Sequence, residues 1–173
     1  MLIQDLNYQK ISKPLEKNND DYASVSILIH DEKEIIFIKR SEDLPTHKGH
    51  IAFPGGKKEV EDQSIVDTAV REACEELLID SKTITPIGIL NPIDTVEYKF
   101  EVYPVVCLIT DKPNSFNKSE VQDLYYVSIE ELEKEKNWIF RGHYDSDWIF
   151  DIYGEILWGA TAKMVRNLLN ITL

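Results

Sequence analysis

Blocks of apolar residues separated by short polar segments run along the chain, and they predict a protein dominated by strands. Runs rich in Val, Ile, Phe and Tyr favour extended backbone, because β-branched and aromatic side chains pack well on a pleated surface. Such runs cover residues 23–30, 34–39, 51–53, 83–90, 100–110 and 121–127, and a hairpin over 147–158 turns near Gly154. Helical spacing predicts a helix after Ser64, a short polar helix over 129–136 and a last amphipathic helix over 159–170.

The order of these elements predicts the fold class. Strands dominate, one long helix is inserted early and another ends the pattern, which indicates an α/β (α+β) protein with a mixed β-sheet sandwiched between α-helices. A length of 173 residues fits one domain with a core of its own. We expect this single domain to span residues 23–173, preceded by a polar leader over residues 1–22.

The helix after Ser64 has a clear start and two different faces. Ser64 is a candidate N-cap, and Asp67 three residues later makes an acidic variant of the capping box. At about 100° per residue, one face gathers the apolar side chains of Val66, Ala69, Val70, Ala73 and Leu77. Well away from that face lie three carboxylates, Glu72, Glu75 and Glu76. We expect them to point to solvent or into a cleft.

Carboxylates three and four residues apart on one helical face repel each other, so their grouping has two interpretations. One is a solvated acidic surface. The other is a site for a divalent cation such as Mg²⁺, which prefers hard oxygen ligands and often bridges to phosphates. Gly55 and Gly56 lie just upstream, where the backbone could come close enough for a carbonyl to join the metal ligands. Such a site suits metal-assisted displacement at phosphorus.

The charge balance limits the class of partner. There are 19 basic and 31 acidic residues, which give a net charge of −12. This balance argues against binding of nucleic-acid backbones and against attachment to anionic lipid. Neither a membrane-spanning apolar run nor a signal-peptide pattern is visible, so we expect a cytoplasmic protein. The two cysteines, Cys74 and Cys107, are expected to be buried free thiols.

The segment from Gly56 to Leu77 resembles the signature box of the Nudix hydrolases. The matching residues are Gly56, an acidic turn with Asp62, and the run Arg71-Glu72-Ala73-Cys74-Glu75-Glu76-Leu77. This sequence differs from the usual box in three ways: Asp62 stands where Glu is usual, the spacing from Asp62 to Arg71 is one residue longer, and Leu78 replaces a late glycine. The third difference should alter only the end of the helix.

A second motif resembles the coenzyme A pyrophosphatase-like branch of that family. It consists of Ile36 to Ser41, then Gly49, then Phe53-Pro54-Gly55-Gly56 at the spacing of the branch. Pro45 stands where the branch has a second arginine, and His47 and Lys48 lie close enough to substitute for it. Further similarities, at residues 103–106, 120–121 and 158–162, extend the resemblance over roughly residues 23–170.

The resemblance implies roles for individual residues. Glu72, Glu75 and Glu76 would hold Mg²⁺ or Mn²⁺ with the Gly56 carbonyl, and Arg71 would orient Glu75. Glu120 would bind metal or act as general base, unless it is only a surface charge. Asp62 would support the metal ligands or simply form the turn. The set implied to contact the nucleotide substrate comprises Arg40, Ser41, Lys48, Gly49 and Phe53.

The resemblance implies a metal-dependent pyrophosphohydrolase that cleaves coenzyme A or its thioesters to 4′-phosphopantetheine and adenosine 3′,5′-bisphosphate. Pro45 keeps other substrates open: ADP-ribose, NADH, dinucleoside polyphosphates and nucleoside triphosphates. A third alternative is a non-catalytic ligand-binding module, which would not need the carboxylates. The partner would be a small nucleotide diphosphate, with no nucleic acid and no membrane. The sequence also allows a homodimer.

Overall fold

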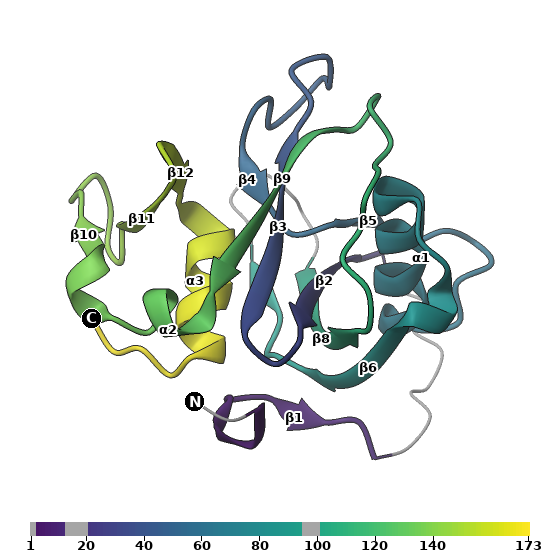
Figure 1. The fold of residues 1–173 in the computed structure, drawn as a ribbon, viewed down its shortest axis with the longest axis horizontal. Coiled ribbons are helices and arrows are strands. Elements are labelled where there is room, and N and C mark those ends of the chain that lie inside the picture. The colour runs from purple at the N-terminus through teal and green to yellow at the C-terminus, as the bar shows by residue number, and fades with distance from the viewer. Residues whose placement is uncertain (1–2, 13–20, 95–100) are drawn as a thin grey trace.

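A computed structural model describes residues 3–12, 21–94 and 101–173 of the chain. Most described strands join one mixed sheet (Figure 1). Its strands are β1 (Gln9–Lys10), β2 (Ala23–His30), β3 (Glu34–Arg40), β4 (Ile51–Ala52), β5 (Gly55–Lys57), β6 (Ile84–Ile89), β7 (Ile93–Asp94), β8 (Glu101–Ile109) and β9 (Val121–Ser128). A smaller antiparallel sheet contains β10 (Trp138–Phe140), β11 (Trp148–Ile152) and β12 (Glu155–Leu157).

Strand β2 lies at the centre of the large sheet. It pairs in parallel with β8 and antiparallel with β3, while β5 pairs with its first residues, Ser24 opposite Gly56. The path β1-β6-β8-β2-β3-β4 completes the sheet, and β9 pairs with the length of β3. One parallel pair among antiparallel ones makes the sheet mixed, which confirms the predicted class.

Helices cover both faces of this sheet, with α1 (Ile65–Leu77) on one side and α3 (Gly159–Leu168) on the other (Figure 1). Alternate residues of β2 serve the two sides: Ile27 belongs to the core on the α3 side, and Leu28 to the core under α1. Side chains alternate between the faces of a strand, so one strand supplies two separate cores. The small sheet packs beside α3, and the ion pair of Lys39 with Glu155 at 2.6 Å ties it to β3.

Most predicted elements are confirmed with small shifts of their ends. The Ser64 side chain accepts a hydrogen bond from the Asp67 backbone N–H at 3.2 Å, as the N-cap prediction requires. The hairpin of β11 and β12 turns through Tyr153 and Gly154, both with positive φ. Of the two free cysteines, Cys107 is buried as predicted, whereas Cys74 is only half-buried.

One predicted helix needs correction, and several short strands were missed. The helix predicted over 129–136 ends early: α2 (Ile129–Leu132) is a single turn, followed by a 3₁₀ turn over Glu135–Asn137. Its buried anchors are Ile129 and Leu132, and the polar residues beyond them have no apolar stripe to continue the helix. The short strands β1, β5, β7 and β10 were not predicted. Part of the predicted leader, β1, pairs with β6. The boundary at residue 22 stays a prediction.

No helix in the described part of the chain has the length and apolar composition needed to cross a membrane.

Candidate active site

The three carboxylates of α1 lie in different surroundings. The Glu76 side chain is only 1% exposed, and its carboxylate accepts a hydrogen bond from the Gly55 backbone N–H at 3.2 Å. Glu72 is also largely buried, whereas Glu75 is 53% exposed. Strand β5, which carries Gly55 and Gly56, lies against the side of α1 that bears Glu72 and Glu76. The helical pattern of the sequence alone therefore did not predict that the Glu76 carboxylate is buried.

Burial makes the charged forms of Glu72 and Glu76 unfavourable. Loss of water raises the pKa of Glu76 to about 8, although Arg40, whose Nη1 lies 3.9 Å from the Glu76 carboxylate, acts in the opposite direction. Burial also raises the pKa of Glu72, against the effect of Arg71. The charge of Glu120, the residue before β9, adds a smaller contribution to both upward shifts, so Glu120 lies in the neighbourhood of the other two carboxylates.

Arg71 is held by a network that centres on Asp62. Two guanidinium nitrogens donate to the Asp62 carboxylate at 3.1 and 3.0 Å, and Nη1 also donates to Glu72 at 2.9 Å and to Glu75 at 3.2 Å. Asp62 is nearly inaccessible and also accepts from the Glu59 N–H and the Thr68 hydroxyl. Burial alone would raise the pKa of Asp62, but these hydrogen bonds outweigh it and hold that pKa below its usual value. Asp62 thus both forms the turn and positions Arg71.

The donor set fits a divalent cation. Glu72 and Glu76 supply hard oxygen donors whose negative charge is poorly solvated, and a bound cation would neutralise it. The backbone at Gly56 comes so close to Glu72 that a Cβ at this position would overlap the carboxylate. Glu75, by contrast, turns toward Arg71. In the residues that the structure describes, no three His, Cys, Asp or Glu side chains converge closely enough to form a metal cluster. The predicted metal ligands, Glu75 included, stay a prediction.

Glu120 is fixed at the start of β9, beside the predicted substrate motif. Its carboxylate accepts a hydrogen bond from the Asn117 side chain at 2.9 Å, and its carbonyl accepts one from the Ser41 N–H at 2.8 Å. Asn117 in turn donates its backbone N–H to the Glu76 carbonyl. These bonds connect α1, β9 and the end of β3 around the carboxylates.

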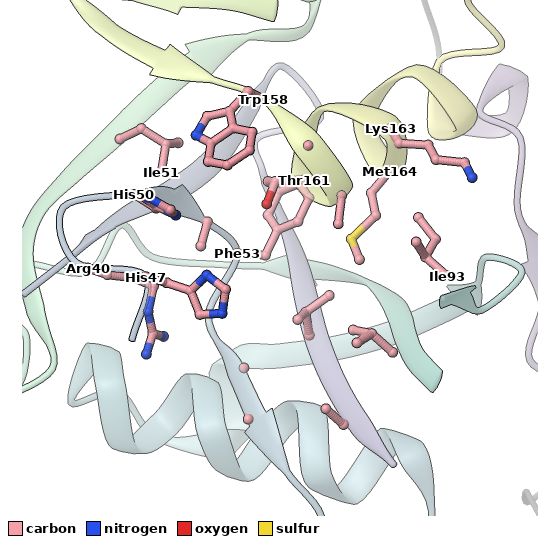
Figure 2. Close-up of a pocket in the computed structure, with 18 of the residues that line it drawn as sticks. Arg40, His47, His50, Ile51, Phe53, Ile93, Trp158, Thr161, Lys163 and Met164 are labelled. Carbon is pink, nitrogen blue, oxygen red and sulfur yellow. The ribbon is translucent and has the colours of Figure 1, made fainter. Parts of the chain in front are cut away.

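A cavity of about 590 Å³ lies beside the carboxylates, on the α3 side of the sheet (Figure 2). Gly55 and Gly56 belong to its wall, so strand β5, which contacts Glu76, also borders the cavity. Arg40 also lines the cavity and reaches the Glu76 carboxylate. The remaining wall is mainly apolar, with polar groups at a few positions, as is usual for small-molecule sites.

The predicted substrate residues divide into two groups. Arg40 and Phe53 line the cavity, and so does His47, one of the two residues suggested to replace the arginine missing at Pro45. Ser41, Lys48 and Gly49 are not among the described residues of its wall. Ser41 is buried, and its hydroxyl accepts from the Asp43 N–H. The substrate contacts predicted for these three residues therefore have no direct support from the cavity.

Sequence reasoning missed several residues of the cavity wall. These are His50, Ile93, Tyr144, Trp158 and Met164, which come from the loop before β4, from β7, from the β10–β11 connection and from the start of α3. They are far apart along the chain, and only the packing of the small sheet and α3 against the large sheet brings them together. The one available signal was the segment Trp158–Ala162, which belongs to the family resemblance but carried no role there.

Comparison with known proteins agrees with this geometry. The profile of the NUDIX domain family matches residues 21–146. The uncharacterized Nudix hydrolase NudL of Yersinia enterocolitica is 33% identical over 158 residues, which cover 87% of this chain and 80% of the relative. NudL of Pectobacterium atrosepticum is 29% identical over 90% of this chain and 84% of its own length.

Among solved structures, DR0079 from Deinococcus radiodurans is similar with a TM-score of 0.58 at 15% identity, covering 91% of this chain and 88% of that protein. A MutT protein from Methanosarcina mazei has a TM-score of 0.51 at 24% identity, covering 69% of this chain and 83% of its own. These two likenesses concern the fold. Together with the family profile and the NudL relatives, they show that the chain belongs to the Nudix hydrolase family, enzymes that cleave pyrophosphate bonds with divalent metal ions.

Proposed function

We propose that this Nudix hydrolase cleaves the diphosphate of coenzyme A or its thioesters, releasing 4′-phosphopantetheine, or its acyl form, and adenosine 3′,5′-bisphosphate. That it acts on a nucleoside diphosphate derivative follows from its family. One observation carries the finer proposal: the cavity wall and the carboxylates share the Gly55–Gly56 segment and Arg40, which belong to the coenzyme A-type motif. A diphosphate bound at that boundary has its phosphorus beside the acidic groups and its two substituents in the cavity.

The metal ligands in this proposal are Glu72, Glu76, the Gly56 carbonyl and Glu75, and the ion is Mg²⁺ or Mn²⁺. When bound, such an ion neutralises phosphate charge and lowers the pKa of a bound water. The protein supplies the rest of the arrangement. Asp62 fixes Arg71, Arg71 fixes the Glu72 carboxylate, and the Gly55 N–H fixes that of Glu76. Glu75, the most exposed of the three α1 carboxylates, also accepts a hydrogen bond from Arg71.

Glu120 is the proposed general base. Two observations support this role: its charge acts on Glu72 and Glu76, and Asn117 orients its carboxylate by a hydrogen bond. As base it would take a proton from the water that attacks phosphorus. In the reaction one P–O bond forms to the water oxygen and the bridging P–O bond breaks, leaving two phosphomonoesters. Arg40 offers a fixed positive charge for the phosphate oxygens at the mouth of the cavity.

A second candidate keeps the chemistry and changes the substrate to ADP-ribose, NADH or a dinucleoside polyphosphate. Pro45 favours it, because the branch motif has an arginine there. An Ap4A hydrolase from C. elegans is similar in fold, with a TM-score of 0.50 at 18% identity; this similarity bears on the fold and not on the substrate. A non-catalytic module is disfavoured by the buried carboxylates, because burial of their charge is unfavourable without a cation.

The experiment that decides between these substrates is product analysis by mass spectrometry. The protein is incubated with Mg²⁺ or Mn²⁺ and equal concentrations of coenzyme A, acetyl-coenzyme A, ADP-ribose, NADH and a dinucleoside polyphosphate. We expect 4′-phosphopantetheine species and adenosine 3′,5′-bisphosphate to dominate. Preferential cleavage of another compound would contradict the coenzyme A assignment, and binding without any cleavage would favour the non-catalytic module.

The cytoplasmic location, a possible homodimer and the absence of nucleic-acid and membrane partners remain expectations from the sequence. The net charge of −12 supports the expected absence of nucleic-acid and membrane partners, because neither a phosphate backbone nor an anionic lipid surface attracts such a protein.

A further inference from the structure

The two ends of the cavity differ in chemistry (Figure 2). At one end, Trp158 lies next to His50 and Ile51, with His47 and Arg40 below them. At the other end lie the aliphatic side chains of Ile93 and Met164, with Lys163 beside them. Of the aromatic rings in the described wall, Phe53 already stacks on Phe37 at 5.0 Å between centroids and is buried in the core. Apart from Tyr144, the remaining rings of the described wall, those of Trp158, His47 and His50, lie at the Trp158 end.

The indole of Trp158 is held in place from several sides. Trp158 follows β12 directly, and its backbone carbonyl accepts a hydrogen bond from the Ala162 N–H, which fixes the backbone at the start of α3. The His50 ring meets it edge-on, at 5.0 Å and an interplanar angle of 70°. The Arg141 guanidinium lies over the ring, 5.5 Å from its centroid, in a cation–π contact. An aromatic plane that is fixed before the ligand arrives loses little entropy on binding.

Asp147 holds the segment that supplies Arg141. Its side chain is completely inaccessible and accepts two hydrogen bonds from the Arg141 guanidinium, at 3.1 and 3.0 Å, and one from the His143 N–H. The hydrogen bonds from Arg141 hold the pKa of Asp147 at about 2, so this carboxylate stays charged over the working range of pH. The same segment carries Tyr144 into the cavity wall. Asp147 therefore fixes both the Arg141 side chain that lies over Trp158 and a segment that contributes to the cavity wall.

We propose that Trp158 is the stacking surface for the adenine base of the substrate, with Arg141 and Asp147 as positioning residues that hold its indole. Adenine is the group that coenzyme A, ADP-ribose, NADH and diadenosine polyphosphates share, so the proposal rests on the nucleotide class of the proposed function and not on coenzyme A itself. Bases stack on aromatic side chains through their flat faces. The aliphatic end of the cavity offers no aromatic plane of this kind and is left for the other substituent of the diphosphate.

The test compares two ligands that differ in the base. Binding of adenosine 3′,5′-bisphosphate and of ribose 5-phosphate is measured by calorimetry with Mg²⁺ present, for the wild type and for Trp158→Leu and Trp158→Phe. We expect Trp158→Leu to lower the affinity for adenosine 3′,5′-bisphosphate roughly tenfold or more and to leave the affinity for ribose 5-phosphate unchanged. Trp158→Phe should give an intermediate affinity for the adenine ligand. An equal loss of affinity for both ligands, or no loss of affinity for the adenine ligand, would overturn the proposal.

Trp148 provides a matched control. It is another half-buried tryptophan of the small sheet, but it packs on Phe140 and is not in the described cavity wall. Trp148→Leu should leave both affinities as in the wild type; the same loss in this variant would mean that the effect of Trp158→Leu is structural. Arg141→Met and Asp147→Asn should lower the ratio of the two affinities in the direction of Trp158→Leu. If the ratio of the two affinities is unchanged in both Arg141→Met and Asp147→Asn, these residues have no positioning role.

The outcome is separable from that of the proposed function. A protein that binds adenosine 3′,5′-bisphosphate through Trp158 but cleaves ADP-ribose rather than coenzyme A keeps the stacking site and loses the substrate assignment. If the wild type cleaves coenzyme A but Trp158→Leu binds the adenine ligand with normal affinity, the substrate assignment is kept and the stacking site is lost.

Discussion

Arg40 Nη1 lies 3.9 Å from the carboxylate of Glu76, and this pair joins the cavity to the acidic side of α1. The two residues come from the end of β3 and the last turn of α1. Arg40 Nε is buried and has no hydrogen-bond partner among the described residues. The positive charge of the guanidinium partly offsets the buried charge of Glu76, and the side chain also lines the cavity.

Replacing Glu76 by Gln separates catalysis from folding. Glutamine has nearly the same shape and can still accept from the Gly55 N–H, but it removes a metal ligand in our proposal. We expect kcat/KM to fall by roughly a hundredfold or more, a size typical of lost charge stabilisation in a transition state, while the metal-free protein keeps or slightly raises its melting temperature. Turnover equal to that of the wild type would show that the metal site is elsewhere.

The stability of the metal-free protein should fall as pH rises from about 4.5 to about 8. The pKa of Glu76 is raised in the folded state, so the folded protein holds a proton that the unfolded chain releases. In that window stability decreases by up to about 1.4 kcal/mol per pH unit. Denaturation by urea at several pH values measures this slope. It should flatten in Glu76→Gln and persist in Glu75→Gln, whose side chain is exposed.

Asp62→Asn should cost both stability and activity. Asparagine at this buried position would present an amide N–H₂ or a weaker acceptor to the Arg71 guanidinium, and losing one partner of a buried ion pair costs about 3 kcal/mol. Arg71 would no longer hold Glu72 in place, so kcat/KM should fall as well. Glu61→Gln, one residue away on the exposed surface, is the control for both measurements. Normal stability of the Asp62 variant would mean that the network contributes little.

Leu78→Gly should stabilise the protein. Leu78 ends α1 in a left-handed conformation, with φ 52° and ψ 44°, and its side chain is 57% exposed. A residue with a Cβ is strained there by about 1 kcal/mol, and glycine is not. The free energy of unfolding should increase by about that amount, whereas Leu78→Ala, which keeps the Cβ, should show no such gain. The position lies after the carboxylates, so activity should be unchanged.

The parts of the fold that local chemistry determines could be predicted from the sequence. Ser64 and Asp67 mark the start of α1, and the turn at Gly154 marks a hairpin, because caps and turns depend on a few adjacent residues. Strands of two or three residues, such as β1 and β10, could not be predicted, because they exist only through pairing with distant partners.

The same distinction applies to the site. The grouping of Glu72 and Glu76 could be predicted from their spacing, but their burial could not, because it depends on strand β5 packing against α1. The aromatic end of the cavity was missed for a related reason. Trp158, His50 and Arg141 meet only after the small sheet has packed against the large one, and no local pattern in the sequence records that contact.

Strand β2 has one further consequence, since its two faces serve different parts of the enzyme. Ala23 and Val25 line the cavity, while Ser26 donates to a carbonyl of α1, the helix that carries the carboxylates. In our proposal, the groups that cleave the diphosphate and the cavity that selects the substrate therefore lie on opposite sides of the same sheet and meet at β5, which carries Gly55 and Gly56. If the proposal holds, substitutions on the α3 side change which molecule is bound and leave the carboxylates of α1 undisturbed, so substrate preference can diversify while the hydrolytic groups are retained.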